Sequence, residues 1–375
     1  MSAAIYVHVP FCRRKCLYCD FASQPYRCGD EKTYLDAVLT EISLRAGEAT
    51  GPAKTVYVGG GTPSVVDPNV LARILDAIRD VFGLAPGAEI TAEANPESAR
   101  PEVLSAWREA GVNRLSLGVQ AWQERLLRAL GRVHDRDAVL RAYEAARAAG
   151  FDNVSVDLMF GLPGQAMADW AETLAAVVDL APEHISAYAL QVEEGTPLER
   201  LVASGRVMVP DEDTQASMYD YLRGVLAAAG YEHYEISNFA RPGYRCRHNL
   251  VYWRNGDYVG LGPAAWSHRG RRRWGNTPDL ATYAARLRAG VLPVAEEETV
   301  DDREAMGETM MLGLRLVEGV DEQDFYIRFG VSARDVFGHQ VAELVDRGLL
   351  EEADGRLRLT GRGLLLGNVV FGAFV

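Results

Sequence analysis

The sequence predicts an α/β protein whose first 230 residues form an open barrel of six strand–helix units. Two observations support this prediction. Short apolar runs alternate with stretches of helical periodicity, which is the pattern of a parallel sheet covered by helices. Glycine-rich or polar clusters follow these runs, and in barrels the chemistry lies at the carboxyl ends of the strands. A doubly wound sheet is the alternative, because it shows the same alternation.

The expected strands are short apolar runs that end in proline, glycine or polar residues. Helical periodicity follows the first two of these strands, over residues 34–47 and 70–82. Pro101 is expected to be the first residue of a further helix. Two helical segments lead to Gly150, and a helix through Leu226 completes the barrel. The six strands are Ile5–Val9, Thr55–Val58, Glu89–Glu93, Arg114–Val119, Val154–Phe160 and His184–Leu190.

The pattern changes after Tyr231, and we divide the rest of the chain into a connecting region, 231–298, and a C-terminal domain, 299–375. The connecting region is expected to hold a strand at 232–236, a basic run at 269–273 and a helix at 279–289. Residues 293–302 are acidic and are expected to form a linker. The C-terminal domain is expected to form three helices and then two short strands around Gly355, an order that resembles a winged helix.

Composition narrows the class of protein. A hydrophobic content of 48% with 24% charged residues is typical of a soluble globular chain. The net charge of −13 argues against a nucleic-acid surface, since phosphate contacts need basic residues. No signal peptide is evident, and the apolar run at 364–375 is too short to span a membrane, so we expect a cytoplasmic protein. Of the five cysteines, we expect Cys28 and Cys246 to be free thiols.

Three cysteines, Cys12, Cys16 and Cys19, follow the first strand with the spacing C-x3-C-x2-C. Three thiolates would bind three irons of a four-iron cluster and leave the fourth iron open. A structural zinc loop is the alternative, with His8 or Asp20 as a weak fourth ligand. The spacing, placed at the mouth of a strand, resembles the signature of radical S-adenosylmethionine (SAM) enzymes. That resemblance implies that SAM chelates the open iron and that an electron from the cluster cleaves it to a 5′-deoxyadenosyl radical.

Further motifs follow the later strands in order. Gly59-Gly60-Gly61-Thr62-Pro63 leaves backbone groups uncovered for a ligand. Glu93 ends the third strand, Gln120 follows the fourth, and Asp157 lies on the fifth, where it can accept hydrogen bonds from a ribose. The Arg132 guanidinium suits a carboxylate, and SAM carries one. Each residue alone could equally belong to a helix cap or a surface ion pair.

Together these motifs resemble the oxygen-independent coproporphyrinogen III dehydrogenase (HemN) group, over roughly the whole chain. The motifs that carry the resemblance are YVHVPFC, GGGTP, EANP, RLSLGVQ, GRVH, DLMFGLPGQ and HISAYALQVEEGTP. The resemblance implies a SAM site lined by Tyr6, Tyr18, Gly60, Gly61, Thr62, Glu93, Gln120, Arg132 and Asp157.

Two related groups then compete: the dehydrogenase, which decarboxylates propionate side chains, and the HemW heme chaperones, which bind heme and pass it to acceptor proteins. The dehydrogenase has a fourth cysteine where this chain has Phe21, and a long extension where only eleven residues precede Cys12. His248-Asn249-Leu250-Val251-Tyr252-Trp253 is similar to the HNxxYW motif of HemW. These features favour the chaperone, with no dehydrogenase activity expected. A non-catalytic interaction protein that keeps the cluster for structure is a third alternative.

The HNxxYW motif suggests a heme site, since histidine can ligate heme iron and aromatic rings can cover a macrocycle. We therefore take His248, Tyr252 and Trp253 as heme-site candidates. The alternative is that His248 and Asn249 only cap a loop while Tyr252 and Trp253 pack between domains. HemW chains usually carry a G-A-H segment where this chain has Ala264-Ala265-Trp266, which leaves His268 as a substitute. Arg13, Arg14 and Lys15 could meet heme propionates or an acidic electron donor, or could form a solvated loop.

The resemblance implies three cofactors, a [4Fe–4S] cluster, SAM and heme. It also implies heme-acceptor proteins and a flavodoxin- or ferredoxin-like electron donor as partners. A homodimer and a peripheral membrane contact of the apolar C-terminus are left open as alternatives, whereas a nucleic-acid partner is not expected.

Overall fold

The structure is a computed structural model that describes residues 4–27, 29–48 and 51–375. Its main feature is a twelve-stranded sheet, within which six parallel strands lie side by side in chain order. A doubly wound fold needs a reversal of strand order, so this alternative is wrong and the predicted open barrel is confirmed. The six strands are β1 (Ala4–Val9), β4 (Ala53–Gly60), β5 (Leu84–Ala94), β6 (Arg114–Gln120), β7 (Val154–Phe160) and β8 (His184–Ala189).

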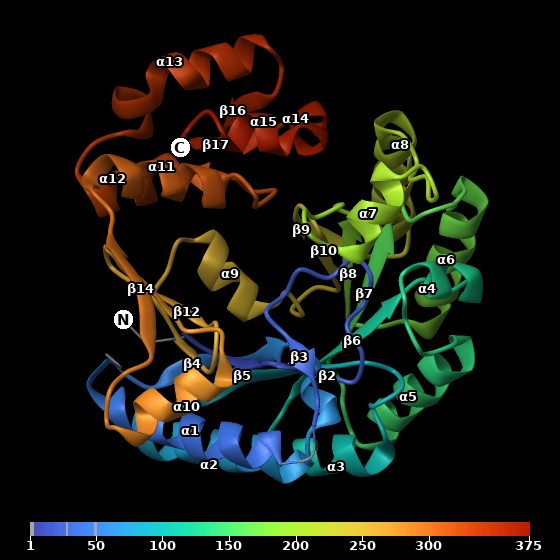
Figure 1. Cartoon of the computed structure of the whole chain (residues 1–375). Coiled ribbons are helices and arrows are strands. Elements are labelled where there is room, and N and C mark those ends of the chain that lie inside the picture. Colours follow the sequence, from blue (N-terminus) through green and yellow to red (C-terminus); the bar gives the residue numbers. More distant parts are fainter. Residues whose placement is uncertain (1–3, 28, 49–50) are drawn as a thin grey trace.

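Helices cover the outer side of this sheet, where α1, α2 and α3 lie along one side (Figure 1). Helix α2 shows why they form there: Asp67 caps its first turn, Pro68 is its first residue, and its apolar side chains are buried against the strands. The helices of the barrel are α1 (Asp30–Leu44), α2 (Pro68–Phe82), α3 (Pro101–Glu109), α4 (Glu124–Ala129), α5 (Arg136–Ala148), α6 (Met167–Leu180), α7 (Pro197–Ala203) and α8 (Glu212–Ala228).

The sheet continues on both edges with residues from beyond position 230. Strands β10 (Asn238–Ala240) and β9 (Glu232–Glu235) extend it beside β8, and β11 (Tyr258–Leu261) pairs in parallel with β1. The antiparallel strands β12 (Trp266–Arg269), β13 (Arg272–Asn276) and β14 (Val294–Thr299) follow on that edge. On the inner side of the sheet, opposite α1 to α3, lies helix α9 (Arg247–Trp253) (Figure 1).

The acidic linker predicted over residues 293–302 is wrong, because Val294–Thr299 forms the edge strand β14. Its acidic side chains point to solvent and pair with the neighbouring basic strand, as Glu297 does with Arg272 and Glu298 with Arg273. Charged side chains on an edge strand also discourage pairing with other chains. The boundary proposed at residue 298 therefore falls inside a strand, whereas the predicted helix at 279–289 is present as α10 (Leu280–Arg288), capped by Asp279.

The C-terminal residues form helices followed by a hairpin, the order predicted for a winged helix. A three-stranded sheet, β15-β17-β16, packs with these helices, which gather beyond α9 in Figure 1. No helix in the described part of the chain is long and apolar enough to cross a membrane. The elements are α11 (Asp302–Gly313), β15 (Val320–Asp321), α12 (Glu322–Phe329), α13 (Ala333–Asp346), β16 (Leu350–Ala353), β17 (Arg356–Leu359), α14 (Gly361–Leu365) and α15 (Gly367–Phe371).

Candidate functional site

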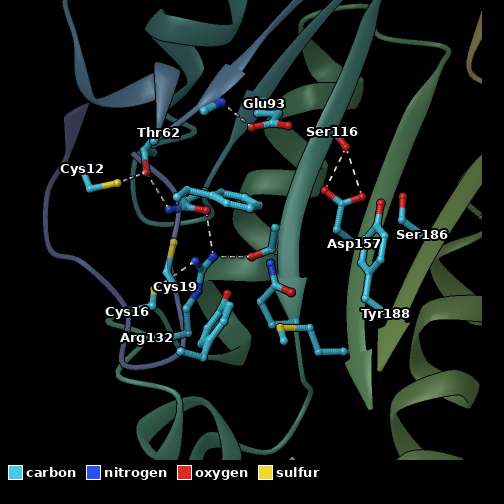
Figure 2. Close-up of a pocket in the computed structure, with 18 of the residues that line it drawn as sticks. Cys12, Cys16, Cys19, Thr62, Glu93, Ser116, Arg132, Asp157, Ser186 and Tyr188 are labelled. Atoms are coloured by element: carbon cyan, nitrogen blue, oxygen red, sulfur yellow. Dashed lines mark hydrogen bonds between the residues drawn. The ribbon is translucent and has the colours of Figure 1, made fainter. Parts of the chain in front are cut away.

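A cavity of about 410 Å³ opens at the carboxyl ends of the parallel strands. The cysteine loop lies on one side of it and Asp157 and Tyr188 lie on the other (Figure 2). The motifs found one by one along the sequence therefore converge on a single space. The predicted residues that line it are Cys12, Cys16, Tyr18, Cys19, Gly60, Gly61, Thr62, Glu93, Gln120, Arg132 and Asp157.

The cysteine loop is anchored by a short parallel pair, β2 (Phe11–Cys12) with β3 (Gln24–Pro25). Cys12 is buried, while Cys16 and Cys19 are half-buried, and all three thiols line the cavity. Burial raises the pKa of the Cys19 thiol, so its thiolate needs a positive partner. Three soft sulfur donors on one wall fit an iron–sulfur cluster.

A chain of hydrogen bonds joins two of these cysteines through the cavity wall. Thr62 Oγ1 lies 3.6 Å from Cys12 Sγ and accepts a 3.1 Å bond from Asn95 Nδ2. Arg132 Nη2 donates to Asn95 Oδ1 at 2.7 Å, and Arg132 Nη1 lies 3.5 Å from Cys16 Sγ (Figure 2). The Arg132 guanidinium is thus held beside the Cys16 thiol and brings a positive charge to this side of the cavity. The Asn95 backbone carbonyl oxygen also accepts from the Ser98 N–H, so this residue orders the turn after β5 as well as the cavity wall.

The glycine run after β4 is required for close packing beside the cysteine strand. A Cβ atom on Gly61 would lie 2.5 Å from the Phe11 carbonyl oxygen, and Gly60 has a φ of +108°. These positions therefore need glycine. The Gly60 N–H already donates to Glu93 Oε2 at 3.2 Å, so this backbone group orders the wall as well as facing the cavity.

Two half-buried carboxyl groups, Glu93 and Asp157, line the inner part of the cavity. Burial raises the pKa of Glu93 to about 7, against the lowering effect of the Tyr57 hydroxyl, which donates to Oε1 at 2.8 Å. Burial likewise raises the pKa of Asp157, which accepts hydrogen bonds from Ser116 at 2.8 and 3.1 Å. Carboxylates that are costly to ionise favour a cationic ligand.

Gln120 reaches the cavity through a backbone irregularity at the end of β6. Its φ is +68°, which is rare for a residue with a side chain, and the pairing of β6 with β7 shifts between Gly118 and Gln120. A Cβ on Gly118 would lie 2.9 Å from Asn95 Oδ1. Strain of this kind gathers at binding sites because a bulge redirects a side chain.

Tyr6 is the one predicted SAM-site residue that does not line the cavity. The Tyr6 hydroxyl lies 3.0 Å from His8 Nδ1, and its ring stacks on Tyr57. Tyr57, and not Tyr6, lines the cavity. Sequence reasoning missed Tyr57 and several further lining residues. For those that lie on strands the available signal was alternation, because inward-facing side chains recur at every second position of a strand. Arg114 and Ser116 on β6 and Ser186 and Tyr188 on β8 are examples.

The HNxxYW motif forms helix α9, and its histidine faces the protein interior. The His248 side chain is fully buried, with Nδ1 2.9 Å from Thr55 Oγ1 and Nε2 2.8 Å from the Tyr252 hydroxyl. Burial lowers the pKa of His248 to about 3, so the ring is neutral. Glu89 accepts the backbone N–H groups of Arg247 and His248, which fixes the start of the helix. Both ring nitrogens are occupied, so in this conformation His248 is not free to ligate heme iron.

Trp253, at the other end of α9, contacts the C-terminal helices. The Arg315 guanidinium lies 4.6 Å from the centre of the Trp253 ring and 5.2 Å from that of Phe371 in α15. Both contacts are within the range of a cation–π interaction. The alternative in which the motif packs between domains therefore agrees with the geometry. The member of the motif that lines the cavity is Asn249.

The remaining candidate residues also divide into some that line the cavity and others that do not. His268 is 4% exposed and its Nδ1 lies 3.0 Å from the Gly256 carbonyl oxygen, whereas Trp266 is 42% exposed. His268 therefore does not take the exposed place of Trp266. Arg14 and Lys15 line the cavity and Arg13 does not. Cys246 is a free thiol, as predicted, and Cys28 lies outside the described residues.

Comparisons with known proteins agree with this architecture. The family model of the Radical SAM superfamily matches residues 6–177, and that of the HemN C-terminal domain matches residues 300–366. A solved structure of coproporphyrinogen III oxidase (HemN) from Escherichia coli superposes with a TM-score of 0.85. It covers 100% of this chain and 90% of that one at 24% identity, which shows a shared fold.

Curated relatives share more sequence. The heme chaperone HemW of Mycobacterium tuberculosis is 42% identical, covering 98% of this chain and 93% of the relative. HemW of Bacillus subtilis is 37% identical, covering 99% of this chain and 98% of the relative. A mitochondrial mouse relative, radical S-adenosyl methionine domain-containing protein 1, is 36% identical over 96% of this chain and 85% of its own length. The chain therefore belongs to the HemW family of the radical SAM superfamily.

Proposed function

We propose that this protein is a cytosolic heme-binding chaperone that carries a SAM-coordinated [4Fe–4S] cluster and delivers heme to acceptor proteins. The observation that carries the proposal is the full-length similarity to relatives named heme chaperones, at 42% and 37% identity. The cavity supports the cofactor part, because its thiols, its arginine and its half-buried carboxyl groups lie where a cluster and a cationic ligand would need them.

Within this proposal, Cys12, Cys16 and Cys19 hold the cluster, which supplies an electron and an open iron for SAM. Arg132 brings a positive charge close to the cysteine loop through the 3.5 Å approach of its Nη1 to Cys16 Sγ. Glu93 offers negative charge to the ammonium and sulfonium groups, Asp157 accepts hydrogen bonds from the ribose, and Gln120 is placed at the mouth by its bulge. Tyr18, Gly60, Gly61 and Thr62 complete the proposed SAM wall.

Phe21 separates this proposal from the dehydrogenase, which shares the fold. It stands where the dehydrogenase resemblance expects a fourth cysteine, is 62% exposed and borders the cavity. We therefore expect no conversion of coproporphyrinogen III to protoporphyrinogen IX. A flavodoxin- or ferredoxin-like donor would reach the cluster from the side of Arg14 and Lys15, which offer positive charge.

A hemin titration of the anaerobically reconstituted protein, followed by its Soret absorbance, tests the proposal. We expect saturation near one heme per chain and transfer of bound heme to an apo-acceptor. Efficient conversion of coproporphyrinogen III by the same preparation would overturn the chaperone assignment, as would hemin binding that never saturates.

The same titration with His248→Ala, with His339→Ala as the surface control, decides the role of the motif histidine. Because both His248 nitrogens are already hydrogen-bonded, we expect its substitution to disturb α9 without removing an iron ligand. A Soret band that is lost in His248→Ala and restored by added imidazole would instead identify His248 as the ligand.

A further inference from the structure

The interior of the barrel is polar on the side of the cavity, where barrels of parallel strands are usually filled by branched apolar side chains. Along β6, residues Arg114, Ser116 and Gln120 all border the cavity. Gln120 lies at the mouth, and Arg114, as the first residue of the strand, lies at the opposite end. We call this deep end the cavity floor. Asn249 belongs to it because Glu89 and Cys246, which are the charge neighbours of Arg114, hold the start of α9, the helix that carries Asn249.

Arg114 is a buried cation whose hydrogen-bond donors are unused. It is 2% exposed, and no hydrogen bond or ion pair joins its side chain to any other residue that the structure describes. Its Nε is buried without a partner. A guanidinium stays charged in proteins, and leaving its N–H groups without acceptors is unfavourable. The Arg114 guanidinium therefore needs a hydrogen-bond acceptor from a ligand in the cavity.

The acidic neighbours of Arg114 do not supply that acceptor. Glu89 accepts from the backbone at the start of α9, and Glu93 accepts from Tyr57 and from the Gly60 N–H. Asp157 accepts from Ser116 and Ser155. These carboxyl groups balance the charge of Arg114 from a distance, yet each is held by its own donors.

Asn249 brings a second unused donor to the same space. Its side chain borders the cavity and makes no hydrogen bond with the described residues. Helix α9 is fixed in place by the Glu89 contacts and by the bond between His248 and Thr55, so the backbone that carries this amide is held in position before any ligand binds. The motif thus presents an amide to the cavity and keeps its histidine for support.

We propose that Arg114 and Asn249 form a carboxylate-binding subsite on the cavity floor. A guanidinium binds a carboxylate through two parallel hydrogen bonds, and the amide can donate a third. The ligand chemistry rests on the proposed function, which offers two sources: a propionate of the tetrapyrrole or the carboxylate of SAM. Arg132, the residue expected to take the SAM carboxylate, already donates to Asn95 Oδ1 and the Gly118 carbonyl oxygen and lies against Cys16 Sγ.

Two ligand pairs that differ only in the carboxylate provide the test. Binding of hemin is compared with hemin dimethyl ester by Soret absorbance, and binding of SAM with decarboxylated SAM by calorimetry, on the reconstituted protein. The variants are Arg114→Met, which keeps the side-chain length without charge, Arg114→Lys and Asn249→Ala. The control is Arg100→Met, a 63% exposed side chain in a surface ion pair with Glu102.

We expect the wild-type protein and Arg100→Met to prefer the carboxylate form of one pair by at least tenfold. Arg114→Met should lose that preference, Arg114→Lys should keep part of it, and Asn249→Ala should reduce it by several-fold. If Arg114→Met loses the preference for hemin over its dimethyl ester, the subsite binds a propionate. If it loses the preference for SAM over decarboxylated SAM, the subsite binds the SAM carboxylate.

A preference that survives in Arg114→Met, or that is absent from the wild-type protein, overturns the subsite. If Arg114→Met does not fold, Arg114→Lys and Asn249→Ala carry the same comparison. Failure of the wild-type protein to bind hemin would overturn the proposed function alone, because the SAM pair still tests the subsite.

Discussion

The cavity wall and helix α9 both carry motifs of polar and aromatic residues, yet they use them in opposite ways. On the wall, the cysteines and Gln120 come from loops and a strand end, Asp157 comes from the middle of β7, and all of them face a shared space. On α9, the His248 ring bonds to Tyr252 and to Thr55 of β4. A residue at the carboxyl end of a parallel strand faces the mouth because of the topology, whereas a helix can turn any of its sides to the core.

The largest effect is expected at the cysteines. Replacing Cys12, Cys16 or Cys19 by serine should abolish the cluster, because each thiolate would bind its own iron. The matched control is Cys246→Ser, since Cys246 is buried beside Glu89, away from the cavity. Iron and sulfide analysis after anaerobic reconstitution measures the result. Full iron content in any of the three loop variants would remove that cysteine from the ligand set.

Much of the wall could be predicted because strand ends meet at one place in a barrel. Glu93 and Gln120 lie at or next to the ends of β5 and β6, where this rule places them, whereas Asp157 lies in the middle of β7 and was proposed from its motif and the family resemblance. Arg114 was missed because it is the first residue of β6, far from the carboxyl end, where only alternation shows that its side chain points inward. The burial of His248 was not predictable, since it depends on Thr55, which is 193 residues away in sequence.

The edge strand β14 was missed for a different reason. Five of its six residues are exposed, so the apolar alternation that marks a strand is absent, and its acidic side chains resemble those of a linker. Its pairing with the basic strand β13 became visible only when the two were placed side by side.

The next largest effect is expected from the substitution of His248. Substitution by alanine should lower the free energy of unfolding of the apo-protein by about 2–4 kcal/mol, because it removes two buried hydrogen bonds and leaves a void. Urea denaturation measures this change, and His339→Ala, on an exposed position, should stay within about 0.5 kcal/mol. An unchanged stability in His248→Ala would contradict the structural role given to α9.

The two regions should also differ in their response to pH. Burial raises the pKa of both Glu93, on the cavity wall, and Glu235, sealed at the end of β9, to about 7. Between pH 4.5 and 7 the folded protein keeps these protons and the unfolded chain loses them. The free energy of unfolding therefore falls as the pH rises, by up to about 3 kcal/mol for each group.

Urea denaturation at pH 5 and pH 8 measures this slope. Glu93→Gln and Glu235→Gln should each flatten it in the apo-protein. Addition of SAM should remove the contribution of Glu93 only, because a cation in the cavity lowers the pKa of that carboxyl group. If SAM flattened the slope equally in Glu93→Gln, the cation would lie elsewhere.

The smallest effect is expected at Ala264, next to the place where this chain departs from the G-A-H segment. Ala264 has a φ of +60°, a conformation that costs a residue with a Cβ about 1 kcal/mol, and glycine adopts it without strain. Ala264→Gly should therefore raise the free energy of unfolding by up to about 1 kcal/mol, whereas Ala265→Gly, at a buried position without a positive φ, should lower it. Thermal unfolding of the two variants separates them. A higher free energy of unfolding in Ala264→Gly would mean that the glycine of the family segment serves the turn. Of the substituted positions, only the exposed Trp266 would then change the surface that this edge of the sheet presents to a ligand.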